Sequence, residues 1–197
     1  MSCVADFPRI LLMNGIASSG DSRVDINQLL NEFYPSSQGR SLLGEFESVE
    51  SVPSPSDCLL DHHEHMTVTV ESHFGQKVNV DVHRCNREGD WYSREITLIT
   101  QQSERTVQYG IVRLDTTTLA ADVWHKIESQ NVPLGRVLIE HNVLREVQMC
   151  ELWKVTAGPR LAEMMHMQLN DELYGRTALI YCDGVPAIEL LEIVVPD

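Results

Sequence analysis

The C-terminal end of the chain constrains the fold most, because it predicts a β-hairpin with a short turn. The runs YGRTALIYC (174–182) and PAIELLEIVVP (186–196) are rich in apolar residues and flank Asp183-Gly184. An Asp-Gly pair between two β-rich runs is a strong hairpin signal, since both residues tolerate a positive φ. We therefore expect two antiparallel neighbours in a sheet.

Further strands are expected upstream of this hairpin. Val78, Val80 and Val82 alternate with polar residues, which is the period of a strand with one buried face. Three more β-rich runs follow, at 91–100, 105–114 and 144–155. Short turns join most of these segments. The sequence therefore predicts an α+β fold: a single antiparallel sheet of about six strands, with helices covering one face.

The expected helices lie between and before these strands. The pattern predicts helices near 24–35, where Asp25 is a candidate N-cap, and at 58–74, 117–129, 133–141 and 158–168. The first 57 residues contain two Ser- and Pro-rich stretches that are typical of loops. We expect 1–57 to be an N-terminal extension of a short helix and loops that packs on a domain of 58–197.

Charge and composition limit the partners. The chain has 197 residues, with 15 Lys and Arg against 29 Asp and Glu, so the formal charge is −14. Nucleic acid is not expected as a partner, because its binding rests on basic contacts to phosphate. No run approaches the roughly 20 apolar residues of a membrane span, and the five dispersed cysteines are typical of reduced thiols. We expect a cytoplasmic monomer or homodimer.

A cluster of histidines raises the question of a metal site. His62, His63 and His65 lie in the segment DHHEHM, and His73 follows on the same expected helix. Three histidines on one helix face could bind zinc. The metalloprotease pattern HExxH is not met, because Thr67 stands at its second histidine position. We expect no metal here, and we interpret the histidines as polar residues that border a buried apolar stripe of the helix.

Two charged residues lie on apolar strands. Arg94 shares a strand face with Ile96 and Leu98, and a buried guanidinium needs an anion, which is either a core carboxylate or a ligand. Glu189 and Glu192 lie three residues apart in the last strand, so they face opposite sides. The one that faces the core could exchange protons near neutrality, or could pair with Arg94 or Arg176.

Together these stretches resemble the chorismate lyase (chorismate pyruvate-lyase) family and its wider relatives. The resemblance runs from Cys58 to Pro196 and rests on the order of LLDHHEHMTVTVESHFGQKVNV, WYSREITLIT, VPLGRVLI, YGRTALIYCDGVP and LLEIVVP. It implies an antiparallel sheet with helices over the site. It also implies cleavage of chorismate into 4-hydroxybenzoate, or an isomeric hydroxybenzoate, and pyruvate, without metal or organic cofactor.

The resemblance also assigns roles to residues. It places the ring carboxylate of the substrate on Arg94 and on the backbone amides of Met66 and Leu134, and it makes Glu192 the proton-transfer group. A second family arginine falls on Ile111, so the nearest candidate for the second carboxylate is Arg113. Arg176 completes the expected substrate-binding residues, with a salt bridge as its alternative role.

Two functions remain open from the sequence. The first is a lyase acting on chorismate or a related aromatic carboxylate. The second is a non-catalytic module of the same fold that binds such a small molecule. An arginine alone is enough for a binding module, whereas catalysis also needs the acid Glu192.

Overall fold

A seven-stranded antiparallel sheet forms the centre of the computed structural model, which describes residues 24–195. The strand order is β1-β5-β6-β7-β4-β3-β2. The strands are β1 (Gly44–Val49), β2 (Val78–Glu88), β3 (Trp91–Thr100), β4 (Thr106–Asp115), β5 (Arg145–Ala157), β6 (Glu172–Cys182) and β7 (Val185–Val194). The α+β prediction with a single antiparallel sheet is confirmed.

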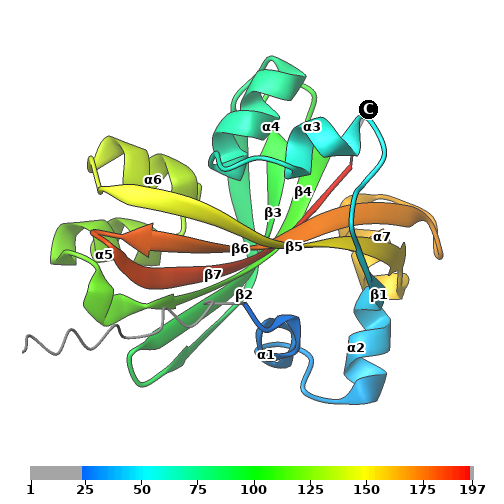
Figure 1. The fold of residues 1–197 in the computed structure, drawn as a ribbon, viewed down its shortest axis with the longest axis horizontal. Coiled ribbons are helices and arrows are strands. Elements are labelled where there is room, and N and C mark those ends of the chain that lie inside the picture. Colours follow the sequence, from blue (N-terminus) through cyan, green and yellow to red (C-terminus); the bar gives the residue numbers. More distant parts are fainter. Residues whose placement is uncertain (1–23, 196–197) are drawn as a thin grey trace, which may run out of the picture.

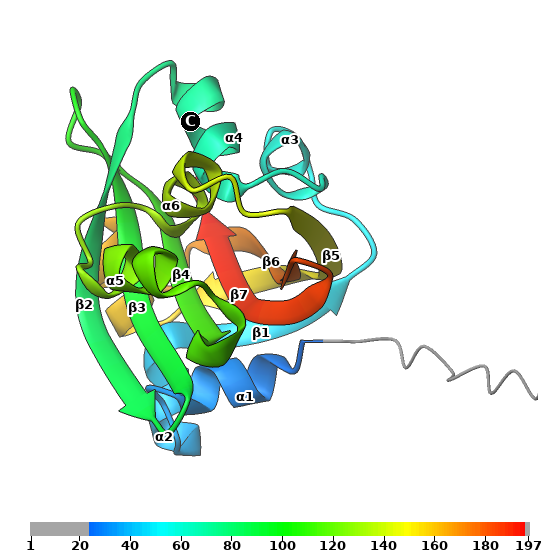
Figure 2. The same ribbon diagram turned by 90° about the vertical axis from the view of Figure 1, so that its left-hand side faces the viewer.

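The helices divide between the two faces of this sheet (Figures 1 and 2). One group, here called the upper helices, comprises α3 (Ser56–Leu60), α4 (Met66–Phe74), α5 (Ala121–Glu128) and α6 (Leu134–Glu140). This group covers one face, as expected. On the other face α1 (Ile26–Asn31) and α7 (Pro159–Met165) pack against the sheet, and α2 (Ser37–Leu43) packs on α7.

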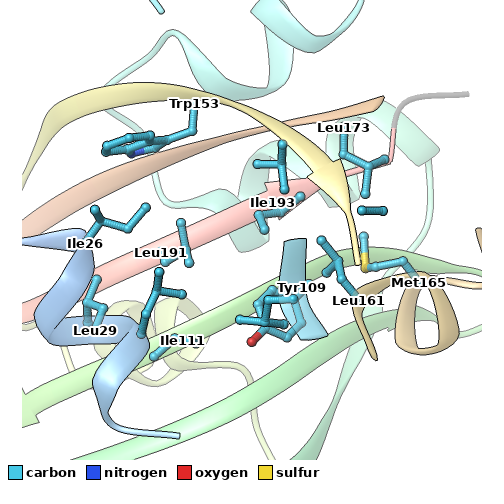
Figure 3. Close-up of a cluster of buried hydrophobic side chains, with 14 of the residues drawn as sticks. Ile26, Leu29, Tyr109, Ile111, Trp153, Leu161, Met165, Leu173, Leu191 and Ile193 are labelled. Carbon is cyan, nitrogen blue, oxygen red and sulfur yellow. The ribbon is translucent and has the colours of Figure 1, made fainter. Parts of the chain in front are cut away.

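Each face of the sheet has its own hydrophobic core. Figure 3 shows the core beneath the lower face, where Ile26 and Leu29 of α1 lie close to Ile111 and Leu191 of the central strands. The upper helices pack on the alternate residues of the same strands, such as Val112 and Leu190. A central strand is therefore apolar on both sides, and a charged side chain on either face lies in a dry environment.

The C-terminal hairpin forms as predicted. Asp183 and Gly184 both have positive φ angles, 51° and 81°, which is the backbone geometry of a tight two-residue hairpin turn. The first expected helix also forms, and the Asp25 side chain caps it by accepting from the backbone N–H of Asn27 at 2.9 Å.

Two expectations differ from the structure. The helix expected at 58–74 is two helices, α3 and α4, separated by a loop from Asp61 to His65. The first 57 residues also contribute strand β1, which pairs with β5 at the edge of the sheet. The division of the chain at residue 57 remains a prediction. Within residues 24–195, no helix is both long and apolar enough to cross a membrane.

Candidate functional site

A small cavity lies between the upper helices and the sheet. Its free volume is about 40 Å³. Its floor consists of cavity-facing residues of the sheet, and the first residues of α4 and α6 form its opposite wall. Most of the lining is apolar: Met66, Val80, Ile96, Leu98, Val112, Leu134, Val147, Ile180 and Leu190. Four polar side chains stand out in this lining: Arg94, Gln108, Arg176 and Glu192.

Arg94 is the most unusual group in the cavity. Its side chain comes from β3 beside Ile96 and Leu98, and the residue is only 1% exposed. In residues 24–195, its Nε and Nη1 have no hydrogen-bond partner, and no acidic side chain pairs with it. Burial lowers the pKa of the guanidinium below its usual value. An unpaired buried cation is costly, so this position favours an anion in the cavity.

The start of α4 adds backbone donors to the same cavity. The helix begins at Met66, and its N-cap residue His65 makes no side-chain capping bond. The first intrahelical donors are Val68 and Thr69, so the amides of Met66 and Thr67 do not donate within the helix. The positive end of α4 therefore faces a cavity that already holds an unpaired cation.

A glycine allows the two helices to meet here. Gly135, the second residue of α6, lies so close to α4 that an added Cβ would be 3.0 Å from Thr67 Oγ1 and 3.2 Å from His65 Cβ. A larger residue at this position would push α6 away from α4, and the gap between these two helices in the cavity wall would widen. Leu134, the residue before this glycine, lines the cavity, and its role in binding a carboxylate remains a prediction.

Arg176 lies in the same cavity but its hydrogen-bond donors are occupied. The residue is fully buried, and its Nε donates to Glu192 Oε2 at 2.8 Å. Its Nη1 donates to the carbonyl oxygens of Leu60 and His62, at 3.1 and 2.7 Å, and its Nη2 donates to the carbonyl of Glu64 at 3.2 Å. These bonds join β6 to β7 and to the segment from Leu60 to Glu64, and they leave Arg176 few donors for a ligand. Its role is therefore the salt bridge, which was the alternative to substrate binding.

The same arginine explains the break in the expected helix. The carbonyl groups of residues 60, 62 and 64 point at one guanidinium, which a continuous helix would not allow. The His62 ring supports the loop, since its Nδ1 accepts from the Glu64 amide at 3.1 Å and its Nε2 lies 2.7 Å from the Leu59 carbonyl. Burial and the nearby Arg176 lower the pKa of His62.

The remaining histidines of this segment make separate contacts. His65 accepts from Arg145 Nε at 2.6 Å, and burial with two nearby arginines lowers its pKa to about 4. The Nδ1 atom of His63 lies 3.2 Å from the carbonyl of Val147. Across residues 24–195, the His, Cys, Asp and Glu side chains form no group of three or more that could hold a metal.

Arg113 does not join the cavity. Its side chain projects from the opposite face of β4, where it forms ion pairs with Glu32 and Glu189, each at 3.0 Å, and lies over the Trp91 ring. The prediction that Arg113 binds a second carboxylate in this cavity therefore does not fit the structure, because the register pairs Arg94 with Val112 and turns Arg113 away. Of the two candidate glutamates, Glu192 lines the cavity.

Sequence reasoning missed Gln108, a buried residue of β4 that also lines the cavity. Its Oε1 has no hydrogen-bond partner among the described residues. A signal was present, since Gln108 is the polar exception on the strand face that also carries Gly110 and Val112.

No protein-family model and no curated protein matches the chain. Solved structures do match. The effector domain of PhnF from Mycobacterium smegmatis is 10% identical, with 66% of this chain and 87% of that chain covered and a TM-score of 0.50. The whole PhnF chain is also 10% identical, with 65% and 62% covered and the same TM-score.

A third match is the ligand-binding domain of a GntR-family transcriptional regulator from Bordetella bronchiseptica. It is 15% identical, with 61% of this chain and 86% of that chain covered and a TM-score of 0.45. At these identities the matches show the fold alone, which is the chorismate lyase-like fold of such regulator domains.

The matches correct the prediction of a lyase. PhnF and its effector domain, the two matches described above with a TM-score of 0.50, point to a regulator of this fold rather than to a chorismate lyase. The resemblance in sequence blocks reflects a shared fold, and it does not carry the activity.

Proposed function

We propose that this domain is a non-catalytic module that binds a small carboxylate, with Arg94 as the anchor of the carboxylate group. The observation that supports this most is the buried guanidinium, whose Nε and Nη1 have no partner in the part of the chain that the structure describes. The other buried charged groups of the cavity form a pair, Arg176 with Glu192, so their charges cancel. Among the buried charged groups of the cavity, Arg94 therefore remains as an uncompensated positive charge, and an anionic ligand would neutralise it. Glu64 also lines the cavity but is exposed.

The chemistry of the lining defines the rest of the ligand. Around the charged anchor, the walls are aliphatic side chains, which favour an apolar body over a sugar or a phosphate with many hydroxyls. A guanidinium can bind a carboxylate through two parallel hydrogen bonds. Aromatic carboxylates such as hydroxybenzoates meet both requirements and form the class that we propose.

The cavity size limits the ligand. One water molecule needs about 10–15 Å³ of such volume, so a cavity of about 40 Å³ holds only a small group without movement of its walls. An open groove lined by Asn142, Leu144 and Arg145 adjoins the cavity, and the two share His65 and Val147. A ligand with a ring can enter from this groove if α4 and α6 separate.

Thermal shift with matched ligand pairs tests the proposal. A panel of carboxylates (benzoate, 4-hydroxybenzoate, cyclohexanecarboxylate) should raise the melting temperature in a concentration-dependent way, whereas the corresponding amides should not. Arg94→Met should abolish the shift. The control is Arg113→Met, which removes an arginine from the opposite face and should leave the shift unchanged. Shifts that persist in Arg94→Met would refute the proposal.

The matched structures do not support the expectation that nucleic acid is excluded as a partner. The matched structures include transcriptional regulators, a class of protein that acts on DNA. The proposal for residues 24–195 concerns the small molecule only.

A further inference from the structure

We infer that Gln108 selects ligands that carry a hydrogen-bond donor at the end remote from the carboxylate, such as a hydroxyl or an amino group. This inference rests on the proposed function, because it assumes that Arg94 holds the carboxylate. It gives a role in ligand binding to the carbonyl oxygen of Gln108, which, like the Arg94 guanidinium, lacks a hydrogen-bond partner among the described residues. The proposed ligand class is thereby narrowed to hydroxy- or amino-carboxylates.

The register of the sheet separates the two groups. Arg94 pairs with Val112, and Leu98 pairs with Gln108, so Arg94 and Gln108 lie four residues apart along the β3–β4 pair. At about 3.3 Å per residue, their backbones are separated by roughly 13 Å. Both side chains project from the same face and line one cavity. A ligand held by both must therefore be elongated, with polar groups at opposite ends.

On the β3–β4 pair, the floor between these groups is apolar. The pair between them is Ile96 and Gly110, so β4 contributes no side chain at the centre of the floor. An added Cβ on Gly110 would lie 3.5 Å from Ile96 and 3.2 Å from the Leu191 carbonyl. The body of the ligand that spans the two ends therefore meets hydrocarbon on β3 and β4, which suits a ring or a short methylene chain. The next two strands place the Glu192–Arg176 ion pair beside this surface.

The surroundings of Gln108 give its carbonyl no partner. Its cross-strand neighbours are Leu98 on β3 and Val194 on β7, and both belong to a buried apolar cluster. Gln108 is 4% exposed, and its Oε1 accepts no hydrogen bond from residues 24–195. A leucine would fill this place at lower cost, so the amide is unexplained by packing. A donor from the ligand would satisfy it.

Oε1 is the atom of the Gln108 amide that is buried without a partner among residues 24–195. A carbonyl oxygen accepts and cannot donate, so it distinguishes a hydroxyl or an amine from a methyl group of similar size. Sites that hydrogen-bond a substrate hydroxyl discriminate strongly against analogues that lack it, because the buried partner is then left unpaired. Arg94 therefore sets the requirement for a carboxylate, and Gln108 sets the requirement for the donor.

Calorimetric titration with size-matched acids tests this inference. The probes are 4-hydroxybenzoate and 4-aminobenzoate, which carry donors, and 4-methylbenzoate, which does not. For the natural chain we expect the two donors to bind at least about fivefold tighter than the methyl compound, the effect of one net hydrogen bond. In Gln108→Leu this preference should vanish or reverse. The aliphatic pair 4-hydroxybutyrate and pentanoate repeats the comparison for a ligand without a ring.

The outcomes separate this inference from the proposed function. If the acids bind through Arg94 but 4-methylbenzoate binds as tightly as 4-hydroxybenzoate, the inference about Gln108 is wrong and the proposed function stands. If no acid binds, or if Arg94→Met binds all of them normally, the proposed function fails. Because Gln108→Leu replaces an unsatisfied amide by an apolar group, it should fold at least as well as the natural chain. A preference that survives in Gln108→Leu would also overturn the inference.

Discussion

The cavity contains two buried arginines whose replacement should change stability in opposite directions. Arg94 lacks a partner among the described residues, so Arg94→Met removes an uncompensated buried charge and supplies a flexible apolar chain of similar length. Arg176 makes an ion pair and three bonds to carbonyl oxygens, so Arg176→Met leaves Glu192 buried without its partner.

The magnitudes follow from the cost of buried charges. Arg94→Met should raise the free energy of unfolding of the ligand-free domain by about 1–3 kcal/mol, since burying an unpaired ion costs several kcal/mol after relaxation. Arg176→Met should lower it by about 3–5 kcal/mol, the range for breaking a buried pair from one side. The loop 61–65 should lose its conformation as well, because its carbonyl oxygens lose their common donor.

Urea denaturation of the three proteins measures both effects under identical conditions. An unchanged dependence on urea concentration would show that the surface exposed on unfolding is the same, so that the difference in midpoint reports stability. The reasoning is refuted if Arg94→Met destabilises the domain by more than about 1 kcal/mol, because Arg94 would then have a structural partner. Equal destabilisation by both variants would refute it too.

Three further predictions concern the surroundings of the cavity and the opposite face. The pKa of His65 is about 4 in the folded domain and 6.5 in its ordinary state, so the stability that neutral His65 contributes is present above pH 6.5 and is lost as the pH falls towards 4. Urea denaturation should show a loss in the free energy of unfolding on the order of 3 kcal/mol across this window. In His65→Gln this pH dependence should disappear. Tyr109→Phe deletes a 2.8 Å hydrogen bond to the fully buried Glu95 and should cost about 1–3 kcal/mol in urea denaturation, with carboxylate affinity unchanged; unaltered stability would contradict this. Gly135→Ala places a Cβ 3.0 Å from Thr67 Oγ1 and should lower the free energy of unfolding by about 1–3 kcal/mol in urea denaturation. An unchanged free energy of unfolding would show that α6 moves without cost.

The local parts of the fold could be read from the sequence. The Asp183-Gly184 turn needs only its own two residues and the flanking runs, and the alternation around Arg94 places it on one face with Ile96 and Leu98. Both features are properties of neighbouring residues, so no knowledge of the tertiary fold was needed to predict them.

The parts that depend on distant residues could not be read in this way. The loop at 61–65 exists because Arg176, more than 100 residues away, binds its carbonyl oxygens. Whether Arg113 faces the cavity depends on the strand register, which pairs Arg94 with Val112. Strand β1 is short and lies at the edge, with Glu45 and Glu47 in a run that lacks a clear apolar face.

The same limit applies to function. Arg94, Glu192 and the starts of α4 and α6 line a cavity, but a cavity of this kind does not define a reaction. The difference between Arg94, which is unpaired, and Arg176, whose donors are occupied, appears only when their partners are known.

The most direct test is an NMR titration of the arginine side chains with a carboxylate. In nitrogen-15-labelled protein, the Nε–H signal of Arg94 is identified by its loss in Arg94→Met, and that of Arg176 by its loss in a conservative Arg176→Lys variant. Added 4-hydroxybenzoate should shift the Arg94 signal strongly and leave the Arg176 signal almost unchanged, because Arg176 Nε already donates to Glu192. An Arg94 signal that stays in place while the ligand binds would contradict the account.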